Sequence, residues 1–188
     1  MLTVQLKELT KTNHQSLEKK MVTLMKNMSS KADYAKMLSL FYSFFGGLEL
    51  AMSQHPDLSF LPDQAQRRKS VSLANDLMQL NYPLPELAVA MALPEINNHL
   101  QTIGAMYVME GSTLGGKFIS KMISKQLDIT DDAAFSFFNG YGEATENMWD
   151  VFKQSIEDLN LNDTDKSVVI TSANDTFNQF SKWFDNHG

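Results

Sequence analysis

One histidine stands among charged residues at a spacing that a helix would bring onto one face. Glu18 follows His14 by one helical turn, and Lys7 and Lys11 precede it at steps of four and three residues. At about 100° per residue, the four side chains fall within a stripe roughly 60° wide, beside the apolar face of the same helix. An imidazole there is placed to be an axial ligand or a base, and Glu18 can accept its other ring N–H. A partly buried histidine satisfied by its helical neighbour is the alternative that spacing alone leaves open.

Four glycines interrupt a second segment whose pattern is otherwise helical: Gly104, Gly111, Gly115 and Gly116. Each glycine costs a helix about 1 kcal/mol relative to alanine, so four within so short a segment need a reason. Spacings of seven and four stack Gly104, Gly111 and Gly115 on one face. A face without Cβ atoms lets another helix or a planar ligand approach the backbone closely, and the double glycine predicts a kink near Gly115 and Gly116.

Other motifs in the sequence do not support a second chemistry. The segment 111–117 resembles a phosphate loop, but the spacing is wrong and no strand precedes it. A di-iron bundle needs paired Glu-x-x-His motifs, and Glu95 and His99 are one residue too far apart. His55 and His187 are expected to be ordinary surface residues, and His99 a polar surface or structural residue.

Composition and charge exclude several classes of protein. Sixteen Lys and Arg against twenty-two Asp and Glu give a net charge of −6, and only two of the cations are Arg, so nucleic-acid binding is not expected. The absence of cysteine removes disulfides, thiolate nucleophiles and iron–sulfur ligation. No signal peptide and no run of 18 apolar residues is visible, so we expect a cytoplasmic protein without a membrane span. A chain of 188 residues fits one domain over 1–188.

The hydrophobic period is helical nearly throughout and predicts an all-α fold of six to eight helices. One long first helix is expected over 2–28. Ser30 and Asp33 form a capping box for the second helix, which must end before Pro56.

The rest of the chain continues the helical pattern. A third helix is expected over about 62–80, and a long one over about 94–126 with Pro94 at its start. A short helix follows the cap at 130–132. The last two helices are expected over about 143–159 and from about Thr164.

His14 and the segment YVMEGSTLGG over 107–116 together resemble the biliverdin-producing heme oxygenases. The likeness is greatest to the bacterial branch, including members encoded with bacteriophytochromes. In that family the first helix supplies the proximal iron ligand, and a kinked, glycine-rich distal helix lies over the heme. The resemblance therefore implies a multi-helix bundle of the heme oxygenase type, with the distal catalytic face formed by Gly111, Ser112, Gly115 and Gly116.

The resemblance also implies how heme, as substrate and cofactor, would be held. His14 would ligate the heme iron through one ring nitrogen, and Glu18 would polarise the other. The opening segment LKELTKTNH over 6–14 places Lys7 and Lys11 at the pocket edge, and FKQ over 152–154 places Lys153 there. These lysines would pair with the propionates as point charges.

Two positions depart from the mammalian-type pattern. That pattern has an Asp after the first distal glycine, where it orders water near bound dioxygen, and this chain has Ser112. It also has an Arg four residues after the lysine matched by Lys153, and this chain has Glu157. Ser112 is then a candidate for the water network, and the resemblance does not fix which meso carbon is cleaved.

The implied reaction is O2- and electron-dependent cleavage of heme to biliverdin, Fe²⁺ and CO. It implies an electron donor of the ferredoxin or reductase type, and a biliverdin-using bacteriophytochrome as a further partner. The main alternative is a non-enzymatic heme or tetrapyrrole carrier on the same scaffold. A thiamin-degrading enzyme of this architecture usually relies on a cysteine, which is absent, and a helical adaptor would leave the glycines unexplained.

Overall fold

The computed structural model describes residues 1–55 and 58–188, and no strand occurs in these two ranges. Their eight α-helices lie within the predicted six to eight and confirm the all-α fold. The helices are α1 (Leu2–Leu9), α2 (Lys11–Lys26), α3 (Lys31–Met52), α4 (Val71–Gln79), α5 (His99–Gly111), α6 (Thr113–Leu127), α7 (Thr145–Asp158) and α8 (Asp163–His187). None of the described helices is both long enough and apolar enough to cross a membrane.

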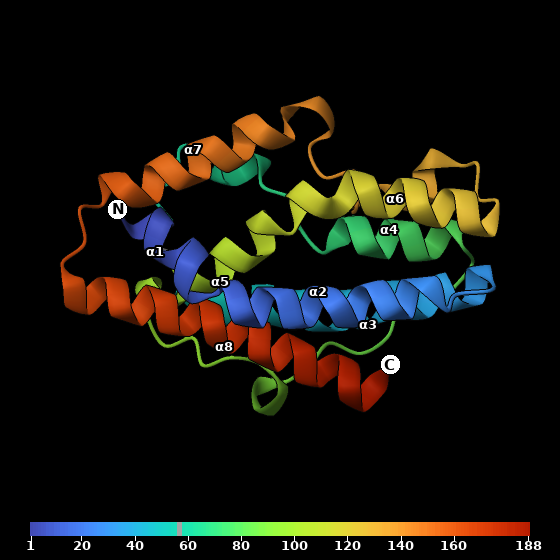
Figure 1. The fold of residues 1–188 in the computed structure, drawn as a ribbon, viewed down its shortest axis with the longest axis horizontal. Coiled ribbons are helices and arrows are strands. Elements are labelled where there is room, and N and C mark those ends of the chain that lie inside the picture. The colour runs from blue at the N-terminus through green and yellow to red at the C-terminus, as the bar shows by residue number, and fades with distance from the viewer. Residues whose placement is uncertain (56–57) are drawn as a thin grey trace.

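The core is an aromatic cluster between α3 and α8. Phe44 stacks on Phe180 with ring centroids 4.5 Å apart, and Phe41 meets the same ring edge-on at 5.0 Å. Aromatic pairs in these offset and edge-to-face arrangements stabilise beyond the apolar area that they bury. Figure 1 shows how the other helices are arranged around this core. Helices α1 and α2 run across one face together with α5 and α6, and α7 lies on the opposite side from α8.

The first helix is not continuous as predicted, because it breaks into α1 and α2 at Thr10. The Thr10 hydroxyl donates to the Leu6 carbonyl at 2.7 Å, and its backbone N–H donates to the same oxygen at 3.0 Å. A threonine that bonds back to the preceding turn bends a helix. The break therefore lies four residues before His14.

Two helix starts also differ from the prediction. The helix expected from residue 62 begins at Val71, because Arg67 is extended and its side chain is buried against Asp63 and Glu110. The helix expected from Pro94 begins at His99.

The later start of α5 follows from its cap and from the residues before it. The side chain of Asn98 accepts the Gln101 N–H at 3.0 Å, which caps the helix there. Leu93 and Ile96 are buried in the extended segment that precedes it.

The remaining boundaries lie close to their predicted positions. The capping box of Ser30 and Asp33 is present at the start of α3, which ends at Met52. Pro56, expected to limit this helix, lies outside the described residues. The segment after Thr130 forms a 3-10 turn over Asp132–Phe135 in place of an α-helix.

Glu157 of α7 holds the N-terminus of α1. Its carboxylate accepts the Thr3 N–H at 2.7 Å, the Thr3 hydroxyl at 2.6 Å and the Leu2 N–H at 3.0 Å. Partial burial raises the pKa of this carboxyl, but the hydrogen bonds from Thr3 and Leu2 outweigh burial and lower the pKa below its ordinary value. The residue that replaces the mammalian-type Arg is thus the cap of α1.

We expect Glu157→Gln to destabilise the protein at neutral pH by about 0.5–2 kcal/mol, the usual cost of a lost helix cap. The folded pKa is the lower one, so this stabilisation is complete above the ordinary value of 4.5 and is lost as pH falls through the folded pKa. Urea unfolding at several pH values measures the difference between parent and variant, which should shrink in acid. Glu8→Gln, at an exposed position of α1, is the control; a difference that grows in acid would contradict this role.

Candidate functional site

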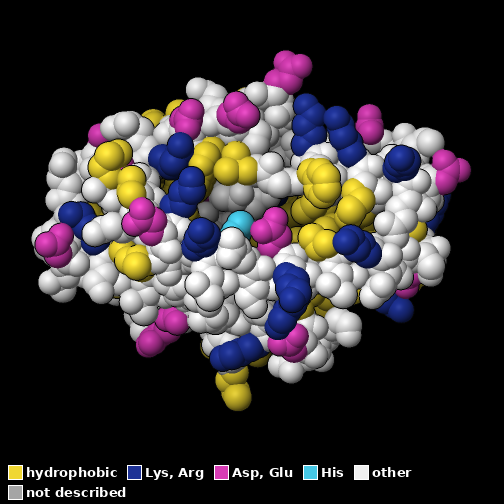
Figure 2. Space-filling view, in the orientation of Figure 1, with side chains coloured by type: hydrophobic (Ala, Val, Ile, Leu, Met, Phe, Trp, Pro, Cys, Tyr) yellow, Lys and Arg dark blue, Asp and Glu magenta, His cyan; other side chains and the backbone are white. Residues whose placement is uncertain are grey.

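A hollow lies on the face that α2 shares with α5 and α6. At one end the Gln126 amide of α6 donates to the Met25 carbonyl at 3.0 Å and to the Met28 carbonyl at 2.6 Å. Near the α1–α2 break, Tyr107 of α5 interacts with Thr10; burial raises the pKa of this tyrosine and the Thr10 hydroxyl opposes that shift. Figure 2 shows the surface hollowed in this region, with a histidine beside an acidic side chain and apolar side chains on either side.

The α2 wall of this hollow carries His14 and Glu18, both exposed. The His14 ring meets Phe177 of α8 edge-on, with centroids 5.5 Å apart, so an aromatic contact supports one side of the imidazole. The hydrogen bonds of the described residues include none between His14 and Glu18. The ring nitrogens therefore keep their bonding capacity for a ligand or for Glu18 after a rotamer change.

The glycines on the opposite wall divide into two kinds. A Cβ atom at Gly115 would meet nothing within 4 Å, and one at Gly111 would meet only the far edge of Trp149 at 3.7 Å. A Cβ at Gly104 would lie 2.4 Å from the Val169 carbonyl oxygen of α8, so this glycine exists for helix packing. Of the two alternatives left open for the stacked glycines, Gly104 thus fits the close approach of another helix, unlike Gly111 and Gly115.

Gly116 belongs to the packing kind as well. A Cβ there would lie 1.9 Å from the Phe138 carbonyl oxygen, which is backbone and cannot move aside cheaply. Gly116 therefore adds no open surface to this wall, although it was predicted to form part of the distal face. The open surface of this wall consists of Gly111 and Gly115, flanked by Leu114 and Phe118, whose exposures are 47% and 69%.

The distal helix bends at Ser112, not near Gly115 and Gly116 as predicted, and hydroxyl groups bond to the backbone carbonyls there. The Ser112 hydroxyl donates to the Met109 carbonyl, and the Thr113 hydroxyl donates to the Glu110 carbonyl, each at 2.6 Å. Two successive side chains that bond back to the preceding turn end α5 and start α6 in a new direction.

The three lysines predicted to pair with the propionates lie on three different helices. Lys7 is exposed on α1 and Lys11 is exposed at the start of α2. Lys153 on α7 pairs with Asp150 at 2.8 Å, and its ammonium lies 5.8 Å from the Trp149 ring centroid. Because Trp149 borders Gly111, the structure brings Lys153 to the α7 end of the distal wall.

Two aromatic residues of this wall were missed from the sequence. The rings of Trp149 and Tyr107 lie 5.4 Å apart, and Trp149 also stacks on Phe152. The available signal was that Trp149 lies four residues before Lys153, which places both on one face of α7. Without knowing that α7 packs beside Gly111, that spacing did not point to the site.

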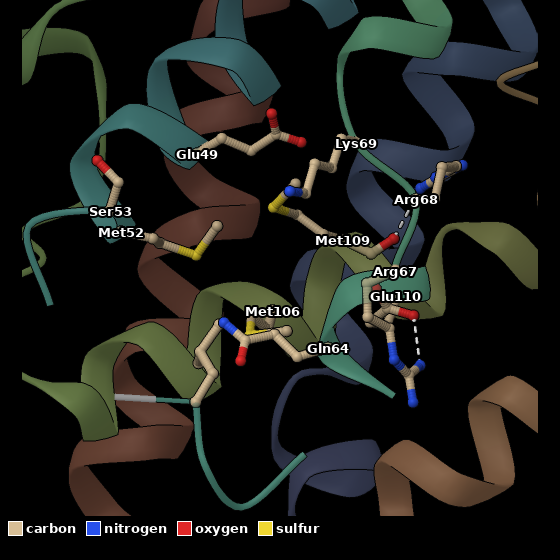
Figure 3. Close-up of a pocket in the computed structure, with 11 residues that line it drawn as sticks. Glu49, Met52, Ser53, Gln64, Arg67, Arg68, Lys69, Met106, Met109 and Glu110 are labelled. Atoms are coloured by element: carbon tan, nitrogen blue, oxygen red, sulfur yellow. Dashed lines mark hydrogen bonds and ion pairs between the residues drawn. The ribbon is translucent and has the colours of Figure 1, made fainter. Parts of the chain in front are cut away.

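A cavity of about 330 Å³ lies elsewhere, and none of the predicted site residues lines it. Figure 3 shows its walls, with Arg67 bonded to Glu110 and Arg68 bonded to the Met109 carbonyl. The cavity has no histidine among its lining residues, so it offers no imidazole ligand. We therefore place the candidate site in the hollow of His14 and Gly115.

The fold and this face define an all-α protein in which an exposed histidine on one helix lies across a hollow from a bent helix with two open glycines. The model of the heme oxygenase family matches residues 1–186. The chain therefore belongs to the heme oxygenase family. No curated protein matches its sequence.

Solved structures are similar to the whole chain. The heme oxygenase from Leptospira interrogans has a TM-score of 0.80 at 16% identity, and the match covers 98% of each chain. Heme oxygenase-1 from the cyanobacterium Synechocystis sp. PCC6803, solved in complex with heme, has a TM-score of 0.75 at 20% identity, covering 98% of this chain and 91% of that one. At these identities the likeness shows the fold.

Proposed function

We propose that this protein binds heme in the hollow between α2 and α6 and cleaves it, with dioxygen and electrons, to biliverdin, Fe²⁺ and CO. The observation that carries the proposal is the pairing of an exposed imidazole, His14, with the open backbone of Gly115, which has nothing within 4 Å of a Cβ position. Membership of the heme oxygenase family supports the reaction class. The whole chain, 1–188, would act as one domain.

The residues of the hollow fit a flat, partly anionic macrocycle. Gly111 and Gly115 leave room for close approach of a ring, and the exposed side chains of Leu114 and Phe118 offer apolar contact. On the other side, His14 can supply a neutral imidazole nitrogen, with Glu18 one turn away to accept the other ring N–H. Lys7, Lys11 and Lys153 would pair with the propionates.

Each wall would have a separate task. Bound heme supplies both the redox-active iron and the macrocycle that is cleaved. His14 would hold the macrocycle at a fixed height, and the glycine backbone would exclude side-chain ligands from its other face. The Ser112 hydroxyl donates its proton to the Met109 carbonyl and accepts a hydrogen bond from Arg68, so it would offer a distal water only its second acceptor position.

Hemin titration followed by turnover tests the proposal. Purified protein mixed with hemin should give a Soret band of histidine-ligated heme. Addition of a reductant in air should then replace that band with the absorption of biliverdin, with release of CO and of iron that a ferrous chelator detects. A stable Soret band under the same conditions would identify a heme carrier and overturn the enzymatic part of the proposal.

Substitution of the lysines should change how heme is held. We expect Lys153→Ala and Lys7→Ala to weaken hemin binding by about 0.5–2 kcal/mol or to alter the ratio of biliverdin isomers, because each removes a partly exposed partner of a propionate. Hemin titration and chromatography of the products measure the two effects. Lys182→Ala, an exposed lysine near the end of α8, is the control. Unchanged affinity and isomer ratio in both variants would remove these lysines from the site.

An electron donor and a biliverdin acceptor complete the proposed reaction. Lys and Arg side chains surround the hollow in Figure 2, although the chain as a whole carries a charge of −6. A local basic rim favours a donor with an acidic surface, such as a ferredoxin or a reductase domain. A bacteriophytochrome that takes up biliverdin is the proposed consumer of the product.

A further inference from the structure

We propose that Arg68 is a positioning residue of the distal wall: its guanidinium fixes the bend between α5 and α6 and thereby the height of the Gly111–Gly115 backbone over the ligand. The inference rests on the proposed function only for the identity of that ligand. It concerns a side chain 43 residues before Gly111 in sequence, in the extended segment before α4.

The contacts of Arg68 converge on the bend. Its Nη2 donates to the Ser112 hydroxyl oxygen at 2.7 Å and to the Met109 carbonyl at 2.9 Å, and Figure 3 shows the bond to Met109. Its Nη1 donates to the Phe137 carbonyl at 3.0 Å, and the guanidinium lies 3.8 Å from the centroid of the Phe137 ring. Arg68 therefore joins the bend to the segment that Gly116 packs against.

Side-chain donors add to the backbone bonds at the bend, where the Ser112 N–H still donates to the Val108 carbonyl at 3.1 Å. The Met109 carbonyl receives the Ser112 hydroxyl and Arg68, both of them side-chain donors. A cation at the C-terminal end of α5 is also favourable for the aligned carbonyls of that helix. Removal of the guanidinium leaves the Ser112 hydroxyl as the one remaining side-chain donor to that oxygen among the described residues.

The neighbouring Arg67 shows that the two arginines have different tasks. Arg67 forms ion pairs with Asp63 at 2.7 Å and with Glu110 at 2.8 Å. Among the ion pairs of residues 1–55 and 58–188, Arg68 takes part in none. Its side-chain hydrogen bonds go to two carbonyls and one hydroxyl and its guanidinium lies over an aromatic ring, so the direction of its donors, in addition to its charge, is what the bend uses.

A lysine cannot replace this geometry. The planar guanidinium reaches three oxygens in fixed directions, whereas an ammonium on a flexible stem is a compact point charge. Burial lowers the pKa of Arg68 to about 10, so the side chain is still charged at neutral pH. Arg68→Lys therefore keeps the charge and removes the fork.

The proposal is tested first on the protein without hemin. Hydrogen exchange of the amides over 112–116 should become roughly ten- to a hundredfold faster in Arg68→Lys, the range expected for a lost hydrogen bond to a charged donor. Arg67→Lys is the matched control, because it loses bonds of similar strength without a bond to Ser112 or Met109. In Arg67→Lys, exchange at 112–116 should be faster only by the factor that its loss of global stability predicts, to within about twofold. Equal effects of both variants at these amides would overturn the proposal.

The second arm uses hemin. Arg68→Lys should change the ratio of biliverdin isomers and lower turnover by about a hundredfold or more, since a displacement of about 1 Å at a site has that cost. Retention of the parental isomer ratio and rate would overturn the proposal. If the parent protein binds hemin without cleaving it, the proposed function fails, but exchange at 112–116 still tests Arg68.

Ser112→Ala keeps the test decisive if Arg68→Lys does not fold. It removes the hydroxyl that links Arg68 to Met109 and changes no charge, so exchange at 112–116 should rise about three- to tenfold, in proportion to one neutral hydrogen bond. In the double variant Ser112→Ala with Arg68→Lys, the effects should be less than additive, because the two residues share this contact. Strict additivity would overturn the proposal.

Discussion

His14→Ala is expected to abolish the histidine-ligated spectrum of bound hemin and, with it, turnover. His14 is the exposed histidine of the α2 wall, and its ring already rests against Phe177, so no competing bond has to be broken when a ligand arrives. Added imidazole should restore part of the spectrum, because the variant leaves a space of the right shape beside the iron. Absorption spectra of the ferric complex, with and without imidazole, measure the effect.

His99→Ala is the control for this prediction. His99 is also exposed, but it lies at the first residue of α5, more than three helical turns before Gly111. The variant should keep the parental spectrum and the parental rate. An unchanged spectrum in His14→Ala, together with a lost one in His99→Ala, would reassign the axial ligand and contradict the proposed orientation of heme.

Gly115→Leu is expected to stop heme cleavage and to leave the stability of the ligand-free protein unchanged or raised by up to about 1 kcal/mol. The Leu side chain has open space in the absence of ligand, and leucine has the better helix propensity. With hemin, its four carbon atoms would occupy the surface that the macrocycle must contact. One thermal melt without hemin and one turnover assay are sufficient.

Gly104→Ala is the matched control and should lower stability without stopping heme cleavage. A single methyl group there would lie 2.4 Å from the Val169 carbonyl oxygen, and overpacking of this kind costs about 1–3 kcal/mol. The melting temperature without hemin should fall, and the folded fraction should still cleave heme. A Gly115→Leu protein that cleaves heme at the parental rate would remove Gly115 from the distal face.

The sequence predicted helices well where caps and apolar period agree. Ser30 and Asp33 located the start of α3 because both halves of a capping box are close in sequence. The start of α8 is also set by a local cap, Asn162. The start of α4 was not predictable in this way. It depends on Arg67, whose partner Glu110 is 43 residues away, and tertiary contacts of this kind leave no local pattern.

The sequence indicated which types of residue form the candidate site but not how they are arranged. Four stacked or adjacent glycines indicate close approach, and nothing in the sequence separates approach by a helix from approach by a ligand. Gly104 meets α8 and Gly115 meets open space, although both lie on similar positions of one helical face. The bend at Ser112 was missed because its cause is the pair of hydroxyl groups and the remote Arg68.

The bond from Glu157 to α1 has a mechanical consequence for the opposite wall. The pair α1–α2 is attached at both of its ends, at Leu2 by Glu157 and at Met25 by Gln126. Between these attachments, the ion pair of Lys20 with Asp185 ties α2 to α8. His14 lies in α2 between these two attachments, whereas the opposite wall changes direction at Ser112. We therefore expect a change in the width of the hollow to come from the α5–α6 wall and not from the wall that carries His14.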